Sequence, residues 1–556
     1  MSIPYVPPVR DLAFALEVLG VDRRETLTDL LAEFGRFCAE VIAPLDQPGD
    51  RAGVQLDPAT GAVTTAPGWK DAYARYVEAG WNSVSSDPAF GGGGFPGVLT
   101  TAMQEELNAA SMAFALCPML TQGAVHMISR HGTADQQARW LPNLITGAWT
   151  GTMNLTEAGA GSDVGALTAR AEPLGDGTWR IRGQKIFITY GEHDLAEQIV
   201  HLVLARVPDA PPGTRGISCF IVPKVLPDGS PNGVRCIGIE HKMGIHASPT
   251  CTLEYDGAVG ELVGTPNEGM RHMFTMMNNA RLSVGVEGVG VAVRAYQDAV
   301  GHAKERVQGR VAGSPDRTII GHADVRRMVL QMRAHIEAMR LLALRNSTAI
   351  DDGDEPLADL LTPLTKAWCT DTGAEVARLA TQVVGGMGYI RETGVEQHER
   401  DVRIAAIYEG TNGIQAIDLV GRKLIADDGA AMRRAVDDVM ATADALGDAS
   451  GDALRHGART LTEASDWLRT AWAKDPRQAL AGATPYLRLA ATVVSGGLLG
   501  RQALVAAGGA ATDPFLAAKV TTARLFLEQA VPSATGLLPS ITAGAEVLDA
   551  IPTALL

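Results

Sequence analysis

The 556-residue sequence has no continuous run of about 18 uncharged apolar residues, the length that a membrane-spanning helix needs. The first twenty residues, MSIPYVPPVRDLAFALEVLG, also lack the basic start and apolar run of a secretory signal. Positive charge is scarce: 48 Lys and Arg stand against 63 Asp and Glu, for a net charge of −15. We therefore expect a soluble cytoplasmic protein with no membrane or nucleic-acid partner.

Metal-binding patterns are absent from the sequence. Its cysteines form no CxxC motif and no Cys/His cluster, and its twelve histidines show no ligand-like spacing. We predict no metal site, and we expect His126, His131 and His322 to be structural or surface residues. The six cysteines are predicted to be reduced and mostly buried: Cys38, Cys117, Cys219, Cys236, Cys251 and Cys369.

The chain is too long for one hydrophobic core, and the pattern of its residue types changes along its length. Residues 1–150 are helical: in LTDLLAEFGRFCAEVIAPL the apolar residues recur every three or four positions. The glycine-rich PAFGGGGFPG (88–97) must be a loop. Residues 151–267 contain short runs rich in Ile, Val, Phe and Thr, separated by turn residues, and are predicted to form a middle β domain.

Long amphipathic segments return in residues 268–425 and predict an antiparallel helical bundle. Residues 426–556 are rich in alanine and contain at least three more helical stretches. We expect a structural role for this last region, in which its helices pack on the bundle or on another subunit. The predicted fold is thus mixed and mainly α, with an N-terminal helical domain, a β domain, a helical bundle and an extra C-terminal helical domain.

The segment IYEGTNGIQ (407–415) carries the most chemical information. An apolar run leads into Glu409, Gly410 permits a tight turn, and Thr411 is placed to cap a following helix. This helix has Ile414, Ile417 and Val420 on one side. Partial burial at this junction would raise the pKa of Glu409 toward the working pH and make it a general base. The alternative is a carboxylate that merely stabilises a helix start.

A second segment, MNLTEAGAGSDVG (153–165), combines small residues with hydroxyl donors. Such a loop lets backbone amides approach an anionic or polar cofactor closely. Glycine-rich loops are common, so a plain β-turn remains the alternative for this segment taken alone.

Together these segments resemble the acyl-CoA dehydrogenases. MNLTEAGAGSDVG resembles their flavin-contacting signature, and IYEGTNGIQ their catalytic-glutamate segment. KIFITYG (185–191) is similar to the strand that packs on the flavin, while ERVQGR (305–310) and QVVGGMGY (382–389) are similar to segments that reach FAD across a subunit interface. The five matches follow the family order and cover roughly residues 25–425.

The resemblance implies FAD as cofactor, an acyl-CoA thioester as substrate and Glu409 as the base that takes the α-proton, while the β-hydrogen leaves as hydride to the flavin. The backbone amide of Glu409 and a ribityl hydroxyl of FAD would hydrogen-bond the thioester carbonyl and stabilise the developing enolate. The implied FAD contacts are Met153, Leu155, Thr156, Gly161, Ser162, Phe187, Thr189, Arg306, Gln308, Gln382, Gly386 and Thr411. The implied substrate contacts are Asn278, Arg281, Tyr408 and Gly410, with Arg281 beside the catalytic glutamate.

Three positions depart from the family pattern. Met153 stands where many members have an aromatic residue, and Phe187 replaces a frequent Trp. Gly413 replaces a Gln that can contact the adenine, so that contact is in doubt.

The C-terminal extension and several local strings resemble a long subfamily, the 3-methylmercaptopropionyl-CoA dehydrogenases and their relatives. The strings are GEHDLAEQIVHLVLARVPDAPPGTRGISCFIVPK (191–224) and EHKMGIHASPTCTLEYDGAVGELVG (240–264). The substrate hypothesis is therefore 3-methylmercaptopropionyl-CoA, an intermediate of DMSP-type acid catabolism. A straight-chain acyl-CoA of fatty-acid catabolism is the competitor.

Two other classes of function compete with this one. An alkylation-response flavoprotein of this superfamily binds DNA, which needs a basic surface. Residues 426–556 contain 11 Lys and Arg against 14 Asp and Glu, a net charge of −3, which argues against DNA. A non-catalytic scaffold would be expected to lose the base, and Glu409 is present.

The family norm implies two further partners. An electron-transfer flavoprotein would reoxidise the flavin, although an oxidase that uses O₂ stays open. A homodimer or a dimer of dimers is implied, because Arg306 and Gln382 would serve the flavin of a neighbouring subunit.

Overall fold

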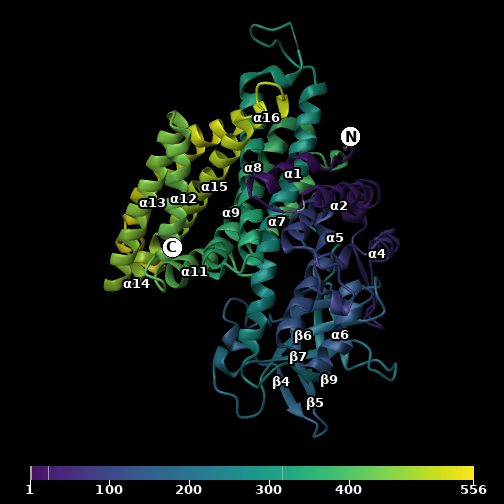
Figure 1. The fold of residues 1–556 in the computed structure, drawn as a ribbon. Coiled ribbons are helices and arrows are strands. Elements are labelled where there is room, and N and C mark those ends of the chain that lie inside the picture. The colour runs from purple at the N-terminus through teal and green to yellow at the C-terminus, as the bar shows by residue number, and fades with distance from the viewer. Residues whose placement is uncertain (1–2, 23, 316, 556) are drawn as a thin grey trace. The chain divides into compact units, whose positions relative to one another are not determined.

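The computed structural model describes residues 3–22, 24–315 and 317–555. Helices dominate, and one large sheet lies in the middle of the sequence (Figure 1). The chain divides into two compact units. The sheet unit comprises Arg36–Thr100 and Ala110–Ala280, and the helical unit comprises Met1–Gly35, Thr101–Ala109 and Arg281–Leu556. Helices α5 (Gly97–His131) and α7 (Gly269–Glu305) contribute residues to both.

The sheet unit is built around a 7-stranded sheet with the order β3-β6-β7-β9-β5-β4, in which β8 pairs with β9. Only the pair of β3 and β6 is parallel; the other pairs are antiparallel. The strands are β3 (Thr150–Asn154), β4 (Arg170–Pro173), β5 (Thr178–Thr189), β6 (Ile199–Ala205), β7 (Ser218–Pro223), β8 (Val234–Ile239) and β9 (Thr250–Leu262). A small hairpin, β1 (Gln55–Leu56) and β2 (Val63–Thr64), is separate from this sheet.

Helices and single turns surround these strands within the same unit. The α-helices are α3 (Ala43–Ala52), α4 (Trp69–Glu78) and α6 (Ala134–Thr146), besides most of α5. A π-helical turn, η1 (Cys38–Ile42), follows α2 (Arg24–Phe37). The 3-10 turns are η2 (Trp81–Ser83), η3 (Pro88–Phe90), η4 (Val164–Ala166) and η5 (Thr214–Gly216).

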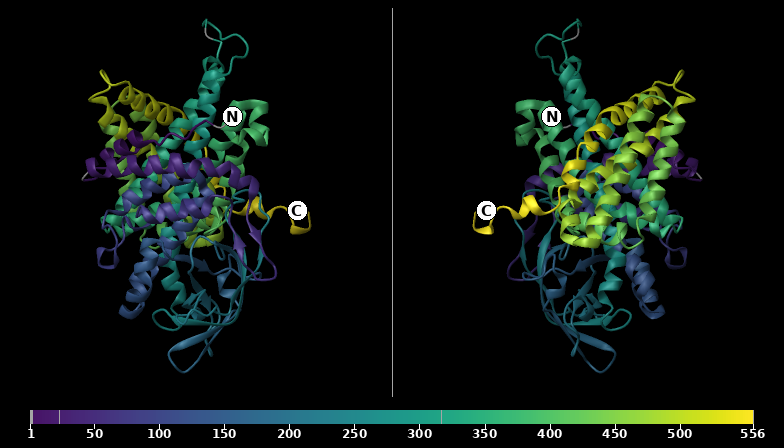
Figure 2. Two further views of the ribbon diagram at one scale, coloured as in Figure 1. Left: turned by 90° about the vertical axis from the view of Figure 1, so that its right-hand side faces the viewer. Right: turned by 90° about the vertical axis from the view of Figure 1, so that its left-hand side faces the viewer.

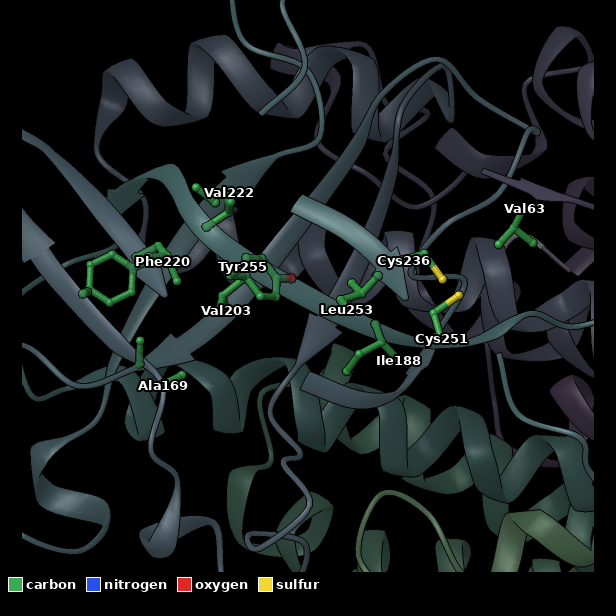
Figure 3. Close-up of a cluster of buried hydrophobic side chains, with 14 residues drawn as sticks. Val63, Ala169, Ile188, Val203, Phe220, Val222, Cys236, Cys251, Leu253 and Tyr255 are labelled. Carbon is green, nitrogen blue, oxygen red and sulfur yellow. The ribbon is translucent and has the colours of Figure 1, made fainter. Parts of the chain in front are cut away.

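The core of the sheet consists of aliphatic and aromatic side chains that come from neighbouring strands. Val203 and Phe220 come from β6 and β7, Leu253 and Tyr255 from β9, and all four are at most 2% exposed (Figure 3). The predicted strands are confirmed, because their β-branched and aromatic residues fill this core.

One irregularity in β5 positions a candidate flavin contact. The register between β5 and β9 shifts between Lys185 and Ile188, as in a β-bulge. Within the bulge Phe187 adopts φ 60° and leaves its side chain 58% exposed. A large apolar ring in the left-handed region and open to solvent is unusual. The bulge therefore turns Phe187 away from the core that its neighbour Ile188 joins.

The helical unit combines the bundle with the C-terminal extension. Its helices before residue 426 are α1 (Val9–Val18), most of α2 (Arg24–Phe37), the second part of α7, α8 (Ala323–Asp351), α9 (Glu355–Val384), α10 (Val395–Val402) and α11 (Asn412–Asp418). The intervening turns are η6 (Ile319–Gly321), η7 (Gly385–Tyr389), η8 (Arg391–Thr393), η9 (Arg403–Ala406) and the π-helical η10 (Leu419–Leu424).

Small residues let α7 and α9 approach closely. A Cβ at Gly288 would collide with the backbone of Cys369 and Thr370, and one at Gly373 with the backbone of Gly288. Glycine at these positions is therefore a packing requirement. The consequence is that Glu287, next to Gly288 on α7, is carried close to the α9 residues around Lys366.

The C-terminal extension forms a layer of antiparallel helices. It contains α12 (Ala430–Leu446), α13 (Ala449–Lys474), α14 (Pro476–Ala481), α15 (Ala483–Ala507), α16 (Pro514–Leu525), η11 (Phe526–Ala530), α17 (Val531–Thr535), α18 (Leu538–Thr542), α19 (Glu546–Asp549) and η12 (Thr553–Leu555). Figure 2 shows the green-to-yellow helices of this region side by side, and α15 also packs against α8 and α9. The predicted mainly α fold with an extra C-terminal helical region is confirmed.

A buried charge cluster fastens the extension to the bundle. Lys519 of α16 donates to Asp11 of α1 at 2.6 Å and lies 3.1 Å from Glu337 of α8. Gln502 of α15 donates to the other oxygen of Glu337 at 2.8 Å. Lys519 and Glu337 are 1% and 3% exposed, and Glu337 also forms an ion pair with Arg333 at 3.0 Å, so the charges of this cluster compensate one another.

Several local predictions are confirmed. Leu27, Leu31 and Phe34 of the predicted N-terminal stripe are buried, and the glycine-rich loop contains a single 3-10 turn before α5. All six cysteines lie among the described residues, none of them forms a disulfide, and all are buried. Helices α5 and α15 are long and apolar enough to cross a membrane. In their most apolar 18-residue stretches, however, 89% and 78% of the residues are buried inside the protein.

Candidate active site

The turn that carries Glu409 has an unusual backbone. Glu409 and Gly410 follow the 3-10 turn η9 and adopt φ 55° and 81°, both in the left-handed region. Glycine accepts this conformation freely, whereas a glutamate there is strained and must be held by its surroundings. Helix α11 starts directly afterwards, and its N-cap Thr411 accepts a hydrogen bond from the backbone N–H of Ile414 at 3.2 Å, as the sequence predicts.

A buried lysine holds this turn from α9. Lys366 Nζ donates to the carbonyl oxygen of Gly410 at 2.8 Å and to Asn412 Oδ1 at 2.9 Å, and its side chain is fully buried. Gln415 Nε2 donates to the carbonyl oxygen of Glu409 at 3.3 Å. The strained backbone of Glu409 and Gly410 is thus fixed by side-chain donors on its C-terminal side.

The carboxyl of Glu409 lies in an environment that suits a base. Loss of water around it raises the pKa of Glu409 to about 7, while the charges of Arg281 and Lys366 act in the opposite direction. Arg281 of α7 is 7% exposed, forms an ion pair with Asp418 at 3.5 Å, and lies against Gly410. A carboxyl with this pKa can accept a proton near neutral pH, which is what a general base needs.

A second carboxyl lies on the other side of the turn. Tyr408, the residue before Glu409, donates through Oη to Glu287 Oε2 at 2.5 Å. Burial raises the pKa of Glu287 to about 8, and the negative charge of Glu409 adds to this effect while Tyr408 and Lys366 oppose it. The structure therefore brings Glu409 together with four other predicted site residues: Arg281, Tyr408, Gly410 and Thr411.

In the sheet unit a buried ion pair shapes the predicted flavin loop. Lys185 of β5 donates to the carbonyl oxygen of Leu155 at 3.0 Å and to Glu157 Oε1 at 2.8 Å. Glu157 in turn accepts hydrogen bonds from the backbone N–H groups of Thr168 and Ala169 at 2.6 and 3.0 Å. The backbone N–H of residue 186 also donates to Thr156 at 2.9 Å, so the segments MNLTE and KIFIT lie side by side.

The residues of these two segments fit a flavin. Thr156 and Thr189 are partly exposed, Ser162 is exposed, and a Cβ at Gly161 would meet nothing within 4 Å. The exposed ring of Phe187 offers an apolar face beside these hydroxyl and amide donors. Met153 is partly exposed at the end of β3, and Leu155 is 8% exposed. A cofactor with polar edges and an apolar ring system requires such groups: open backbone, hydroxyl donors and an uncovered aromatic ring.

The remaining predicted contacts lie at exposed positions. Arg306 and Gln308 follow α7 in a loop whose strands bridge at Val307 and Thr318, and Gln382 and Gly386 lie at the end of α9. Asn278 is exposed on the part of α7 that belongs to the sheet unit. In residues 3–22, 24–315 and 317–555, no group of three or more His, Cys, Asp or Glu is placed to hold a metal ion.

Comparison with known proteins decides the family. The models of the acyl-CoA dehydrogenase N-terminal, middle and C-terminal domains match residues 24–148, 152–258 and 267–425, and an acetyl-CoA dehydrogenase C-terminal-like model matches residues 430–552. The chain belongs to the acyl-CoA dehydrogenase family. It is an acyl-CoA dehydrogenase with the additional C-terminal domain of its long members.

Two curated relatives span nearly the whole chain. A 3-methylmercaptopropionyl-CoA dehydrogenase of Ruegeria pomeroyi is 45% identical over 94% of this chain and 96% of its own length. A broad-specificity linear acyl-CoA dehydrogenase of Mycobacterium tuberculosis is 33% identical over 98% of both chains. The predicted superfamily and long subfamily are confirmed.

Solved structures of acyl-CoA dehydrogenases agree with the fold. Caenorhabditis elegans ACDH-11 in complex with C11-CoA has a TM-score of 0.81 at 19% identity and covers 96% of this chain and 92% of its own. Butyryl-CoA dehydrogenase from Megasphaera elsdenii has a TM-score of 0.61 at 26% identity and covers 76% of this chain and 99% of its own. The second match shows that the family fold exists without the C-terminal extension.

One detail of the segment after Glu409 differs from the sequence prediction. The sequence places Ile414, Ile417 and Val420 on one side of a helix, but Ile417 is 49% exposed whereas Val420 is buried. Helix α11 ends at Asp418, and the π-helical turn η10 (Leu419–Leu424) follows. Val420 therefore lies in a turn whose wider winding departs from the regular α-helical spacing that the sequence prediction assumes.

Sequence reasoning also missed two residues of the site. Lys366 gave no signal, because a single lysine in a long helix is ordinarily a surface residue. Glu287 could have been noticed, since it is the one charged residue in the apolar and glycine-rich run LSVGVEGVGVAV (282–293) of a helix. A carboxyl within an apolar helical stretch is expected to be neutral or paired.

Proposed function

We propose that this acyl-CoA dehydrogenase uses FAD and that Glu409 is the base that removes the α-proton of the thioester. The observation that carries the proposal is the carboxyl of Glu409, held at φ 55° with a pKa raised to about 7 by desolvation. The family assignment supplies the reaction class, and the matched catalytic segment supplies the residue.

The chain provides three aids to proton abstraction. The raised pKa of Glu409 reduces the difference between its pKa and that of the weakly acidic α-carbon. General base catalysis contributes roughly 10²–10⁴-fold to the reaction rate. The backbone N–H of Glu409 would donate to the thioester carbonyl, where one such donor contributes about 3–4 kcal/mol to the developing enolate. Lys366 and Gln415 keep this peptide in place through the carbonyl oxygens of Gly410 and Glu409.

FAD, when bound, accepts the β-hydrogen as hydride, so that the substrate loses one proton and one hydride and gains a C–C double bond. The residues that would hold it in the sheet unit are Met153, Leu155, Thr156, Gly161, Ser162, Phe187 and Thr189, with Thr411 from the catalytic segment. Arg306, Gln308, Gln382 and Gly386 would serve a neighbouring subunit of a homodimer or dimer of dimers. Their exposed positions support this part of the proposal.

Glu409→Gln tests the base directly. The amide cannot accept the proton, so we expect the variant to keep its yellow colour and FAD content but to lose bleaching by an acyl-CoA thioester under anaerobic conditions. The rate should fall by at least about 10³-fold. Bleaching at close to the wild-type rate would rule out Glu409 as the base.

For the substrate we propose 3-methylmercaptopropionyl-CoA. Support comes from the relative of that name at 45% identity over 94% of this chain. The relative acting on linear acyl-CoA at 33% identity makes straight-chain thioesters the alternative. Steady-state rates with 3-methylmercaptopropionyl-CoA and with C4, C8 and C12 thioesters separate the two: a clear preference for C8 or longer would overturn the proposal.

For the electron acceptor we propose an electron-transfer flavoprotein. Support comes from one similar structure, with a TM-score of 0.61 at 26% identity, which belongs to work on the electron transferring flavoprotein of Acidaminococcus fermentans. Turnover should depend on added electron-transfer flavoprotein and be slow with O₂ alone. Hydrogen peroxide production at the rate of thioester oxidation would identify an oxidase instead.

A further inference from the structure

The contact between Tyr408 and Glu287 joins the catalytic turn to the interior of α7. Tyr408 Oη lies 2.5 Å from Glu287 Oε2, and Glu287 is 1% exposed. Its second oxygen, Oε1, is buried and has no hydrogen-bond partner among the described residues. The hydroxyl of Tyr408 is thus the polar partner of a carboxyl that is enclosed in the bundle.

The charge state of Glu287 suits a fixed anchor. Burial raises the pKa of Glu287 to about 8, so the group is mainly a neutral acid at pH 7. The charged or titratable groups that face it are Tyr408, Lys366 and Glu409. Burial also raises the pKa of Tyr408 well above its ordinary value, which keeps the phenol neutral. A neutral pair keeps its hydrogen bond without adding a second full negative charge beside Glu409.

The position of Tyr408 gives this hydrogen bond its importance. The side-chain anchors that follow Glu409 come from Lys366, Gln415 and the Thr411 cap. The Tyr408 hydroxyl supplies a side-chain anchor on the preceding side. A strained residue keeps its conformation only when both flanks are restrained, because the φ 55° backbone of Glu409 would otherwise relax.

We infer that Glu287 is a positioning residue for the dehydrogenation, which holds Tyr408 and thereby fixes the peptide that carries the Glu409 carboxyl. This inference rests on the proposed role of Glu409 as the base. Glu287 acts through Tyr408 and need not touch the substrate or the flavin.

The test uses the full-length FAD-loaded protein and four variants: Glu287→Leu, Glu287→Gln, Tyr408→Phe and Glu287→Leu combined with Tyr408→Phe. Glutamine keeps an acceptor for the tyrosine hydroxyl, whereas leucine removes it. The matched control is Tyr486→Phe, which removes a buried 2.8 Å tyrosine hydrogen bond to Ser465 in the C-terminal extension. Anaerobic stopped-flow gives the rate of flavin reduction at saturating thioester, and titration gives thioester affinity.

We expect Glu287→Leu and Tyr408→Phe each to slow flavin reduction about 10- to 100-fold, because a base displaced by a fraction of an ångström loses alignment. Thioester affinity and FAD content should change by less than about 2-fold, and the double variant should be no slower than the slower single variant. Glu287→Gln should retain at least about a third of the wild-type rate, and Tyr486→Phe should leave the rate as it is.

Thermal unfolding provides a readout that does not depend on turnover. Each single substitution leaves one buried polar group unmatched, whereas the double variant removes both, so its midpoint should not fall by the sum of the two single shifts. A fully additive fall would contradict the coupling.

The two proposals can fail separately. If Glu409→Gln is inactive but Glu287→Leu reduces its flavin at the wild-type rate, the positioning role is overturned and the base assignment stands. If Glu287→Gln is as slow as Glu287→Leu, the hydrogen bond to Tyr408 is not what matters and the inference is wrong. If Glu409→Gln reduces its flavin normally, the proposed base itself is wrong.

Discussion

At the scale of single residues, the chemistry of Glu409 depends on two opposing effects. Desolvation raises the pKa of its carboxyl, and the positive charges of Arg281 and Lys366 lower it, leaving a value of about 7. The backbone at φ 55° keeps this carboxyl in one orientation. A base with a pKa near the working pH combines a useful deprotonated fraction with sufficient proton affinity.

The first prediction concerns pH. Glu409 must be deprotonated to act, so kcat/KM should rise with pH and level off above about pH 7, and it should fall about tenfold per unit well below that pKa. Because the charge of Arg281 lowers the pKa of Glu409, Arg281→Gln should move this acidic limb to higher pH. The measurement is kcat/KM between pH 5.5 and 8.5, a range of about 3 units.

Arg422→Gln is the matched control for this prediction. Arg422 pairs with the same Asp418 as Arg281, at 3.2 Å, but its side chain is 67% exposed. Its removal should leave the acidic limb where it is. An acidic limb that stays in place in Arg281→Gln would contradict the electrostatic account of the Glu409 pKa.

At the scale of secondary-structure elements, two buried lysines join segments that are distant in sequence. Lys185 of β5 ties the loop after β3 to the bulge that exposes Phe187. Lys519 of α16 ties the C-terminal extension to α1 and α8. In both cases a buried ammonium group is compensated by a carboxylate from another element. Removal of Lys185 would leave Glu157 without its ion-pair partner, whereas Glu337 would keep Arg333 at 3.0 Å after removal of Lys519.

The second prediction is that Lys185→Met weakens FAD binding by at least about 10-fold, because Glu157 is left buried and unpaired and the loop loses its attachment. Equilibrium titration of apoprotein with FAD measures the effect. Lys224→Met, which breaks the partly exposed ion pair to Glu192 in the same unit, is the control and should keep FAD affinity. Equal affinities in wild type and Lys185→Met would refute a role for this ion pair in shaping the loop.

The third prediction is that Lys519→Met destabilises the protein by about 1.5–3 kcal/mol, because Glu337 and Asp11 lose a buried charged donor while Glu337 keeps its ion pair with Arg333 at 3.0 Å. Chemical denaturation followed by circular dichroism measures the loss. Arg455→Met removes a cation of exposed ion pairs to Asp444 and Asp452 and should leave the denaturation midpoint almost unchanged. Similar midpoints for both variants would show that the Lys519 cluster contributes no more than a surface pair.

At the scale of the whole molecule, the C-terminal extension is part of the helical unit and not an appendage. Trp368 of α9 is 5% exposed, and Phe526 from the extension packs against it with ring centroids 6.4 Å apart. The butyryl-CoA dehydrogenase structure matched over 76% of this chain shows that shorter relatives do without this cover. The bundle surface under the extension thus combines this aromatic contact with the buried charge cluster around Lys519.

The fourth prediction follows from that surface. A chain that ends after Ile425 would expose the Trp368 face of the bundle and should aggregate or elute as large oligomers in size-exclusion chromatography. Adding a polar substitution, Trp368→Gln, to the truncated chain should reduce this association. A truncated chain that elutes in the same oligomeric state as the full-length protein and keeps its FAD would show that the extension is dispensable for folding.

Much of the architecture follows from local sequence pattern. Short runs rich in Ile, Val, Phe and Thr predict β5, β6 and β7, and helical spacing predicts the long helices, because these signals depend on neighbours within a few residues. The turn at Glu409 is predicted for the same reason: Gly410 and Thr411 are adjacent to it. The burial of Val420 after an exposed Ile417 could not be predicted, because the π-helical turn that begins at Leu419 leaves no signal in the spacing.

The sequence alone determined the family, the elements and the position of the proposed base in the chain, since these are carried by contiguous motifs. Only the tertiary structure decided what surrounds the base. Lys366 meets Gly410 from 44 residues away, and Glu287 meets Tyr408 from 121 residues away. The pKa of a carboxyl depends on the charges and the water within a few ångströms of it, and which residues come that close is set by how α7 and α9 pack, not by their order in the chain.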